Sequence, residues 1–125
     1  MRGEVTSQRE AIVQIDVTRE PTDTSSAEHL RAILDTGFTD FLTLPHEIVT
    51  TLSLRRLRST KVMLADASTV VLNVYSAYVH WHDNWRRIQV LEASGPPLVG
   101  MALLYGSELT IRAIDGGHVR IEPLV

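Results

Sequence analysis

The sequence contains no cysteine, which excludes disulfide bonds, thiolate nucleophiles and cysteine-based zinc sites. No apolar run approaches the roughly 18 consecutive residues that suggest a membrane-spanning helix. The N-terminal residues also lack the apolar core and the small-residue cleavage site of a secretory signal. We therefore expect a soluble, cytoplasmic domain.

Neither sign of charge dominates the chain, which has 12 Lys and Arg, 15 Asp and Glu, and a formal net charge of −3. Charges of both signs are spread along the sequence, so a nucleic-acid partner is not expected. The length of 125 residues fits a single domain spanning 1–125, and a hydrophobic content of 44% is enough for a buried core.

Hydrophobic residues recur with a period of two over most of the chain, which predicts β-strands. In residues 11–18, for example, Ala11, Val13, Ile15 and Val17 alternate with Ile12, Gln14, Asp16 and Thr18, which predicts a half-buried strand. Many short strands with close turn signals predict an all-β, closed-barrel domain with one or two short helices. Further strands are predicted at residues 29–34, 41–44, 55–64, 69–81, 85–93, 108–114 and 118–123, and helices at residues 46–52 and 101–104.

One segment carries an unusual combination of residues, because Ile33 and Leu34 end a strand and Asp35, Thr36 and Gly37 follow directly. Taken alone, Asp-Thr-Gly is typical of a surface turn. The sequence around it changes this interpretation.

The segment resembles the active-site motif of the retropepsin-like (clan AA) aspartic proteases, and the resemblance continues along the chain. Residues 41–45 (FLTLP) continue as in the bacterial branch of that family and lead into a short helix. Residues 97–104 (PLVGMALL) are similar to the second signature of the family, and residues 62–68 (VMLADAS) lie where the family has its flap hairpin. Together these segments match in order and spacing across nearly the whole chain.

The resemblance implies a role for each of these segments. Asp35 would be the catalytic carboxylate, Thr36 would bond to the facing loop of a partner subunit, and Gly37 would donate an N–H beside the carboxylate. A second group would bind substrate as floor and flap, and a third would support the Asp35 loop from behind. The substrate group is Phe38, Leu64, Ala65, Asp66, Ala67, Ser68 and Thr69, and the supporting group is Leu98, Val99 and Gly100.

No metal or cofactor is expected for this chemistry. His80 and His82 have the spacing of neighbours on one strand face, but no cysteine or acidic partner accompanies them. We interpret these histidines as a solvated strand end.

Peptide hydrolysis by carboxylates needs two of them, since one activates water while the other protonates the carbonyl oxygen. The chain supplies only Asp35 in such a setting, because neither Asp66 nor Asp115 follows the right kind of strand. No internal repeat supplies a second lobe. A homodimer would therefore place Asp35 opposite its own copy, and the terminal residues 1–10 and 118–125 are our prediction for the dimer contact.

The predicted function is thus an aspartic endopeptidase acting on an extended peptide or protein substrate. The main alternative is a catalytically silent dimerisation or peptide-binding module of the same fold. A third hypothesis is an enzyme that acts mainly on its own precursor or on one partner protein.

Overall fold

The computed structural model describes all residues 1–125, and the chain is built mainly of short antiparallel strands with two short helices. Neither helix is long or apolar enough to cross a bilayer. The strands are β1 (Arg2–Val5), β2 (Ala11–Thr18), β3 (Glu28–Leu34), β4 (Leu42–Leu44), β5 (Arg55–Met63), β6 (Thr69–Trp81), β7 (Asn84–Glu92), β8 (Leu98–Val99), β9 (Ser107–Ile111) and β10 (His118–Pro123), and the helices are α1 (His46–Thr51), α2 (Met101–Leu104) and the 3₁₀ turn η1 (Thr24–Ser26).

The predicted strands and helices are present, with differences at their ends. Pro45 is the N-cap of α1, with φ −72° and ψ 160°, and the helix ends at Thr51, one residue before the predicted end. β9 ends at Ile111 and not at residue 114, because the chain turns away in a wide loop in which Gly116 has φ 73°. β1 was not predicted, since four residues are too short to show a period.

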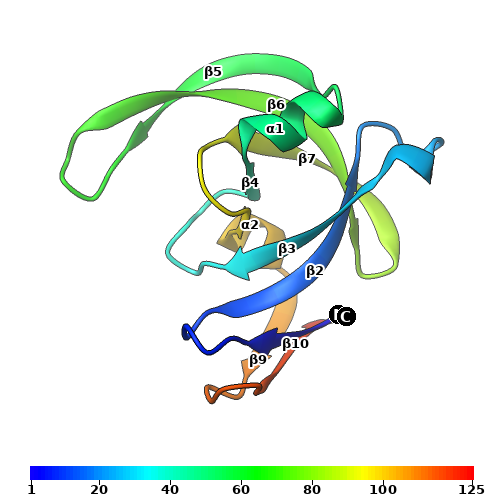
Figure 1. The fold of residues 1–125 in the computed structure, drawn as a ribbon, viewed down its shortest axis with the longest axis vertical. Helices are drawn as coiled ribbons and strands as arrows, with labels where there is room; N and C mark the ends of the chain where they lie inside the picture. The colour runs from blue at the N-terminus through cyan, green and yellow to red at the C-terminus, as the bar shows by residue number, and fades with distance from the viewer.

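Six strands close into a barrel. They follow one another in the order β6-β7-β4-β8-β3-β2, and β2 pairs back onto β6 where Val17 meets Val79. The predicted all-β, single-lobed barrel is therefore confirmed. In Figure 1 the β5–β6 hairpin projects from this barrel as a long arm, and β9 and β10 lie at the opposite end of the molecule.

The barrel encloses one hydrophobic core, to which almost every strand contributes. Leu42 is one of its fully buried residues and pairs with Val90 on one side and Val99 on the other. The alternation seen in the sequence places apolar side chains inward, as expected for half-buried strands. The most deeply buried core side chains are Val13, Val17, Ala32, Leu42, Leu44, Ala77, Val79, Val90, Val99, Leu103 and Ile121.

The terminal strands extend the sheet beyond β2 in the order β1-β10-β9. β1 lies between β2 and β10, and β10 lies between β1 and β9, so both edges of each strand are already paired within the chain. The amino group of Met1 also donates to the carbonyl oxygen of Ile121, at 2.7 Å. The predicted dimer contact at residues 1–10 and 118–125 therefore has no free backbone edge with which to pair a partner's strand.

The burial of Leu42 gives a direct test of the core. Leu42→Ala should lower the free energy of unfolding by about 2–5 kcal/mol, because the fully buried side chain leaves a cavity between paired strands. Urea unfolding measures the change. The matched variant Leu64→Ala, at a 45% exposed position in the β5–β6 turn, should change stability by no more than about 0.5 kcal/mol. Equal losses of unfolding free energy in the two variants would contradict the burial of Leu42 in the core.

Candidate active site

Asp35 is the first residue after β3, and its backbone is fixed by a parallel strand. Ile33 and Leu34 pair in parallel with Leu98 and Val99. The N–H of Asp35 continues this ladder by donating to the carbonyl oxygen of Val99 at 2.9 Å. The carboxylate therefore projects from a strand end whose position is set by a segment more than sixty residues away in sequence.

The carboxylate of Asp35 sits over a tight turn. Its Oδ1 accepts a hydrogen bond from the N–H of Gly37 at 3.0 Å, and its carbonyl oxygen accepts one from the N–H of Phe38 at 3.1 Å. Asp35 is half-buried, whereas Thr36 and Gly37 are exposed. Oδ2 of Asp35 and the hydroxyl of Thr36 make no hydrogen bond within the chain, so both are free to bind another molecule.

The segment from Leu98 to α2, which includes the predicted supporting residues Leu98, Val99 and Gly100, is hydrogen-bonded to this turn and to the loop after it. The N–H of Gly100 donates to the carbonyl oxygen of Phe41 at 3.0 Å, and the N–H of Met101 donates to that of Phe38 at 2.7 Å. The first N–H groups of a helix have no partner inside the helix. Here some of them hold the loop that follows Asp35.

Thr43 is a supporting residue that the sequence analysis missed. Its buried hydroxyl accepts a hydrogen bond from the N–H of Leu98 at 2.9 Å and so ties β4 to β8. A polar residue between two leucines in a predicted strand was the available signal, but alternation alone makes such a residue solvent-facing. Thr43 is buried because strands pack on both of its sides, β7 in parallel and β8 in antiparallel orientation.

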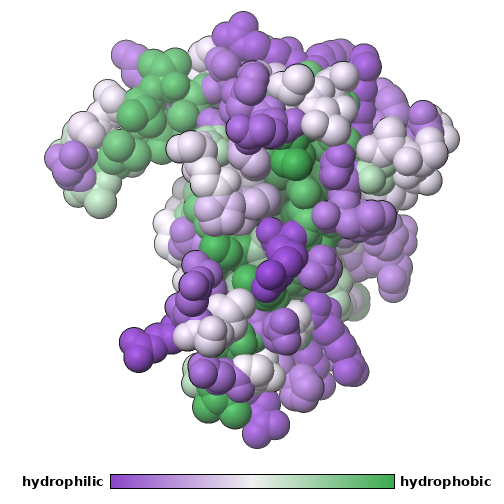
Figure 2. All heavy atoms as spheres, in the orientation of Figure 1, coloured by the Kyte–Doolittle hydropathy of each residue, from purple (hydrophilic) through white to green (hydrophobic).

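The predicted flap is the tip of the β5–β6 hairpin, and all of residues 64–69 are exposed. Its turn is closed by a hydrogen bond from the N–H of Leu64 to the carbonyl oxygen of Ser68 at 2.8 Å, and Ala67 has a positive φ of 68°. Oδ1 of Asp66 accepts from the N–H of Ser68 at 2.9 Å and from its hydroxyl at 2.5 Å. Figure 2 shows apolar side chains gathered along this arm, where Met63 is 72% and Val71 64% exposed.

The structure brings two of the three predicted groups into contact. Asp35 to Phe38 and Leu98 to Gly100 form one hydrogen-bonded unit. The flap residues project away on the arm, and no hydrogen bond joins them to the Asp35 turn. Asp66 and Asp115 lie at separate turns, so Asp35 has no second carboxylate bonded to it from its own chain.

The histidines considered as a metal site have other neighbours. His80 packs edge-on against Trp85, with ring centroids 5.2 Å apart. His82 lies in the turn after β6, where its Nε2 is 2.7 Å from the hydroxyl oxygen of Ser107, and burial lowers its pKa. The structure holds no group of three or more His, Asp or Glu side chains arranged to bind a metal ion.

Comparison with solved structures places this arrangement in a known fold. The chain resembles a retropepsin-like aspartic protease from Rickettsia conorii with a TM-score of 0.62 and 15% identity, covering 98% of this chain and 89% of that one. It also resembles the EIAV protease in complex with the inhibitor HBY-793, with a TM-score of 0.57 and 17% identity over 78% of this chain and 88% of that one. No protein-family model matches the sequence, and no curated protein matches it either.

The chain has the retropepsin-like fold. At this level of identity the likeness concerns the fold alone, and the resemblance drawn from the sequence motifs is confirmed to that extent. Within this fold, the Asp35 turn lies at the end of a strand that is paired with β8, and Oδ2 of Asp35 makes no hydrogen bond within the chain.

Gly100 tests how tightly the Asp35 loop is held. Its backbone is extended, at φ −102° and ψ 179°, so any residue can adopt it, but an added Cβ would lie 2.2 Å from the carbonyl oxygen of Asp40 and 2.5 Å from Cδ2 of Phe38. Gly100→Ala should therefore cost about 1–3 kcal/mol of stability and shift the amide resonances of residues 35–41. Ser94→Ala, on the exposed loop before β8, should change neither. An unaltered spectrum for Gly100→Ala would show that the loop is held loosely.

The flap turn has its own pH dependence. Hydrogen bonds from the hydroxyl and the N–H of Ser68 hold the pKa of Asp66 below its usual range. Because the pKa is lower in the folded chain, the carboxylate stabilises the turn above its ordinary pKa, and this contribution is lost as the pH falls through the folded value. Ser68→Ala should raise the pKa of Asp66 toward the ordinary value, as measured by the ¹³C shift of its carboxyl carbon. Thr69→Ala, which removes no bond to Asp66, should leave that titration in place, and an equal rise in both variants would contradict the role of Ser68.

Proposed function

We propose that this protein is an aspartic endopeptidase that works as a homodimer. The observation that carries the proposal is the Asp35 carboxylate, held in a turn by β8 and α2 with Oδ2 free, in a single-lobed retropepsin-like fold. One lobe provides one such carboxylate. The second comes from Asp35 of the partner subunit, related by a two-fold axis.

The chemistry follows from the proximity of the two carboxylates. Two neighbouring negative charges repel each other, so the pair retains one proton and titrates in two separate steps. The ionised member accepts a proton from a water molecule, which attacks the peptide carbonyl carbon. The protonated member donates to the carbonyl oxygen, and the tetrahedral intermediate then collapses as the amine leaves with a proton.

The exposed hydroxyl of Thr36 and the N–H of Gly37 have different roles in the proposed site. Gly37 fixes one oxygen of the carboxylate, which leaves Oδ2 for water or substrate. Thr36 lies beside it on the exposed side of the turn and has no bond in its own chain, so its hydroxyl is available to the facing turn of the partner. The pair of turns is then locked in register across the axis.

The substrate is an extended peptide bound as a strand between the flap residues 64–69 and a floor that includes Phe38. This mode satisfies the backbone of the peptide and leaves side-chain preference to pockets. The exposed apolar residues of the β5–β6 arm favour substrates with apolar side chains beside the scissile bond. A cytoplasmic location for such an enzyme remains a prediction from the sequence.

The deciding experiment compares the wild type with Asp35→Asn on a mixed peptide library from acidic to neutral pH. The amide cannot act as the ionised base, so cleavage should fall by at least about a hundredfold. Asp83→Asn, an equivalent change in the exposed β6–β7 turn, should cleave as the wild type does. Cleavage that survives in Asp35→Asn would overturn the proposal. Binding of library peptides by a folded dimer that cleaves none would favour the peptide-binding module.

A further inference from the structure

A polar cavity lies on the outer face of the barrel, where the β5–β6 arm begins. Its volume is about 220 Å³, and four segments that are far apart in the sequence line it. Ser76 and Tyr78 of β6 alternate with the buried Ala77 and Val79, so their side chains point away from the core. The lining residues are Arg19, Glu20, Arg55, Ser76, Tyr78 and Arg87.

Strand pairing explains why these segments meet. Tyr78 lies opposite Arg87 of β7, and Ser76 lies opposite Arg55 of β5. Tyr78 also lies opposite Thr18, the last residue of β2, and the chain continues from there into residues 19 and 20. The register of three strand pairs therefore brings three arginines to one cavity.

The three arginines have little to neutralise them. None of them forms an ion pair with a carboxylate of the chain. Nε of Arg87 donates to the hydroxyl oxygen of Ser76 at 3.3 Å, and the hydroxyl of Tyr78 makes no hydrogen bond within the chain. Three Arg and one Glu leave the lining with a net charge of +2. A phosphate monoester carries close to two negative charges at neutral pH, and guanidinium groups bind it by paired hydrogen bonds.

A second, more apolar cavity adjoins the first. Its volume is about 370 Å³, and it shares Ser76 and Arg87 with the polar cavity. Leu57 is exposed there, at 38%. The residues that line only the second cavity are Phe41, Leu57, Ile88 and Gln89. A ligand that spans both cavities needs an anionic end and an apolar body.

We propose that these two cavities form a binding site for a phosphate monoester that carries an apolar ring. The phosphate lies among Arg19, Arg55 and Arg87, where the free hydroxyl of Tyr78 donates a further hydrogen bond. The ring lies against Leu57 and Phe41. A second copy of the chain would present the same positive charges, so charge complementarity favours an anion as the occupant.

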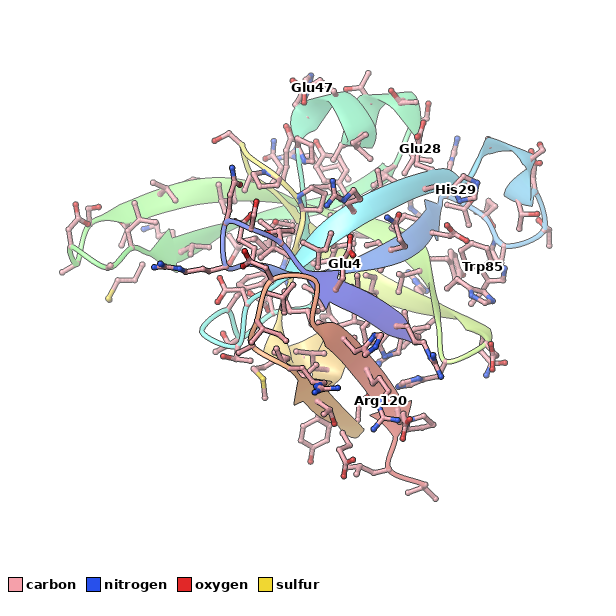
Figure 3. The ribbon with its side chains drawn as sticks, turned by 60° about the horizontal axis from the view of Figure 1, so that its bottom comes forward. Glu4, Glu28, His29, Glu47, Trp85 and Arg120 are labelled. Carbon is pink, nitrogen blue, oxygen red and sulfur yellow. The ribbon has the colours of Figure 1, made fainter.

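The terminal sheet provides a comparison, because it has an arginine cluster without this charge imbalance. Arg2, Arg112 and Arg120 line a cavity of about 260 Å³ on β1, β9 and β10. Figure 3 shows the labelled Arg120 on this sheet. Nη1 of Arg120 lies 3.8 Å from Oε1 of Glu122. Alternation places as many carboxylates as arginines on the same face, and they are Glu4, Glu108 and Glu122.

Titration with phenyl phosphate tests the site, followed by amide NMR at about 0.15 M salt, where long-range charge effects are screened. The resonances of residues 19–20, 55, 76–78 and 87 should shift, and those of the terminal sheet should not. Arg87→Gln should raise the dissociation constant about tenfold or more, because it removes a charged donor. The matched variant Arg112→Gln should change it less than about twofold. Equal losses in the two variants would overturn the proposal.

A second comparison tests the apolar half of the site. Inorganic phosphate should bind more weakly than phenyl phosphate, and Leu57→Ser should weaken phenyl phosphate about threefold or more while leaving inorganic phosphate unchanged. Equal affinities of the two ligands for the wild type would overturn the two-part site. AMP and phosphotyrosine both join a phosphate to a ring, and the tighter binder of the two identifies the source of the ligand.

This inference does not depend on the proposed protease activity. No residue of the Asp35 turn lines either cavity. Asp35→Asn should therefore bind phenyl phosphate with the affinity of the wild type, whether or not the wild type cleaves peptides. Loss of binding in Asp35→Asn would contradict this placement of the site.

Discussion

The candidate site depends on one backbone contact, the parallel pairing of β3 with β8 that ends in the hydrogen bond from Asp35 to Val99. The turn after Asp35 has few hydrogen bonds between its own residues. Its position is fixed by β8, by the close approach of Gly100 and by the first N–H groups of α2. The geometry of the carboxylate is therefore a tertiary property, since it disappears if β8 separates from β3 even when the local turn persists.

That contact also explains the shape of the rest of the barrel. β8 is only two residues long, so its own backbone hydrogen bonds are too few to fix its position. Thr43 anchors it from β4, and the parallel pairing of β4 with β7 closes the ring behind it. The barrel is thus a scaffold in which neighbouring strands position one another, and the far end of the β5–β6 hairpin projects from it.

The parts of the fold and of the candidate site that depend on neighbouring residues in the sequence could be predicted from it. The period of two and the turn residues at 65–68 predicted the strands and the flap hairpin, and the order of motifs around Asp35 led to the fold. The parallel pairings of β3 and β4, the burial of Thr43 and the existence of β1 could not be predicted, because each depends on which distant segment packs alongside. The dimer contact expected at residues 1–10 and 118–125 stays a prediction. The sequence could not indicate that β10 is inserted between β1 and β9 of its own chain, for the same reason.

This insertion changes what a partner copy has to supply. Because β1, β10 and β9 complete the terminal sheet within one chain, the subunit buries its core residues Val119 and Ile121 without help from a second copy. For the proposed dimer, folding and pairing are then separate equilibria. Pairing in that proposal brings two Asp35 carboxylates together, and their repulsion opposes association until one of them takes up a proton. Assembly of the proposed site therefore depends on protein concentration and on protonation, while the fold of each subunit does not.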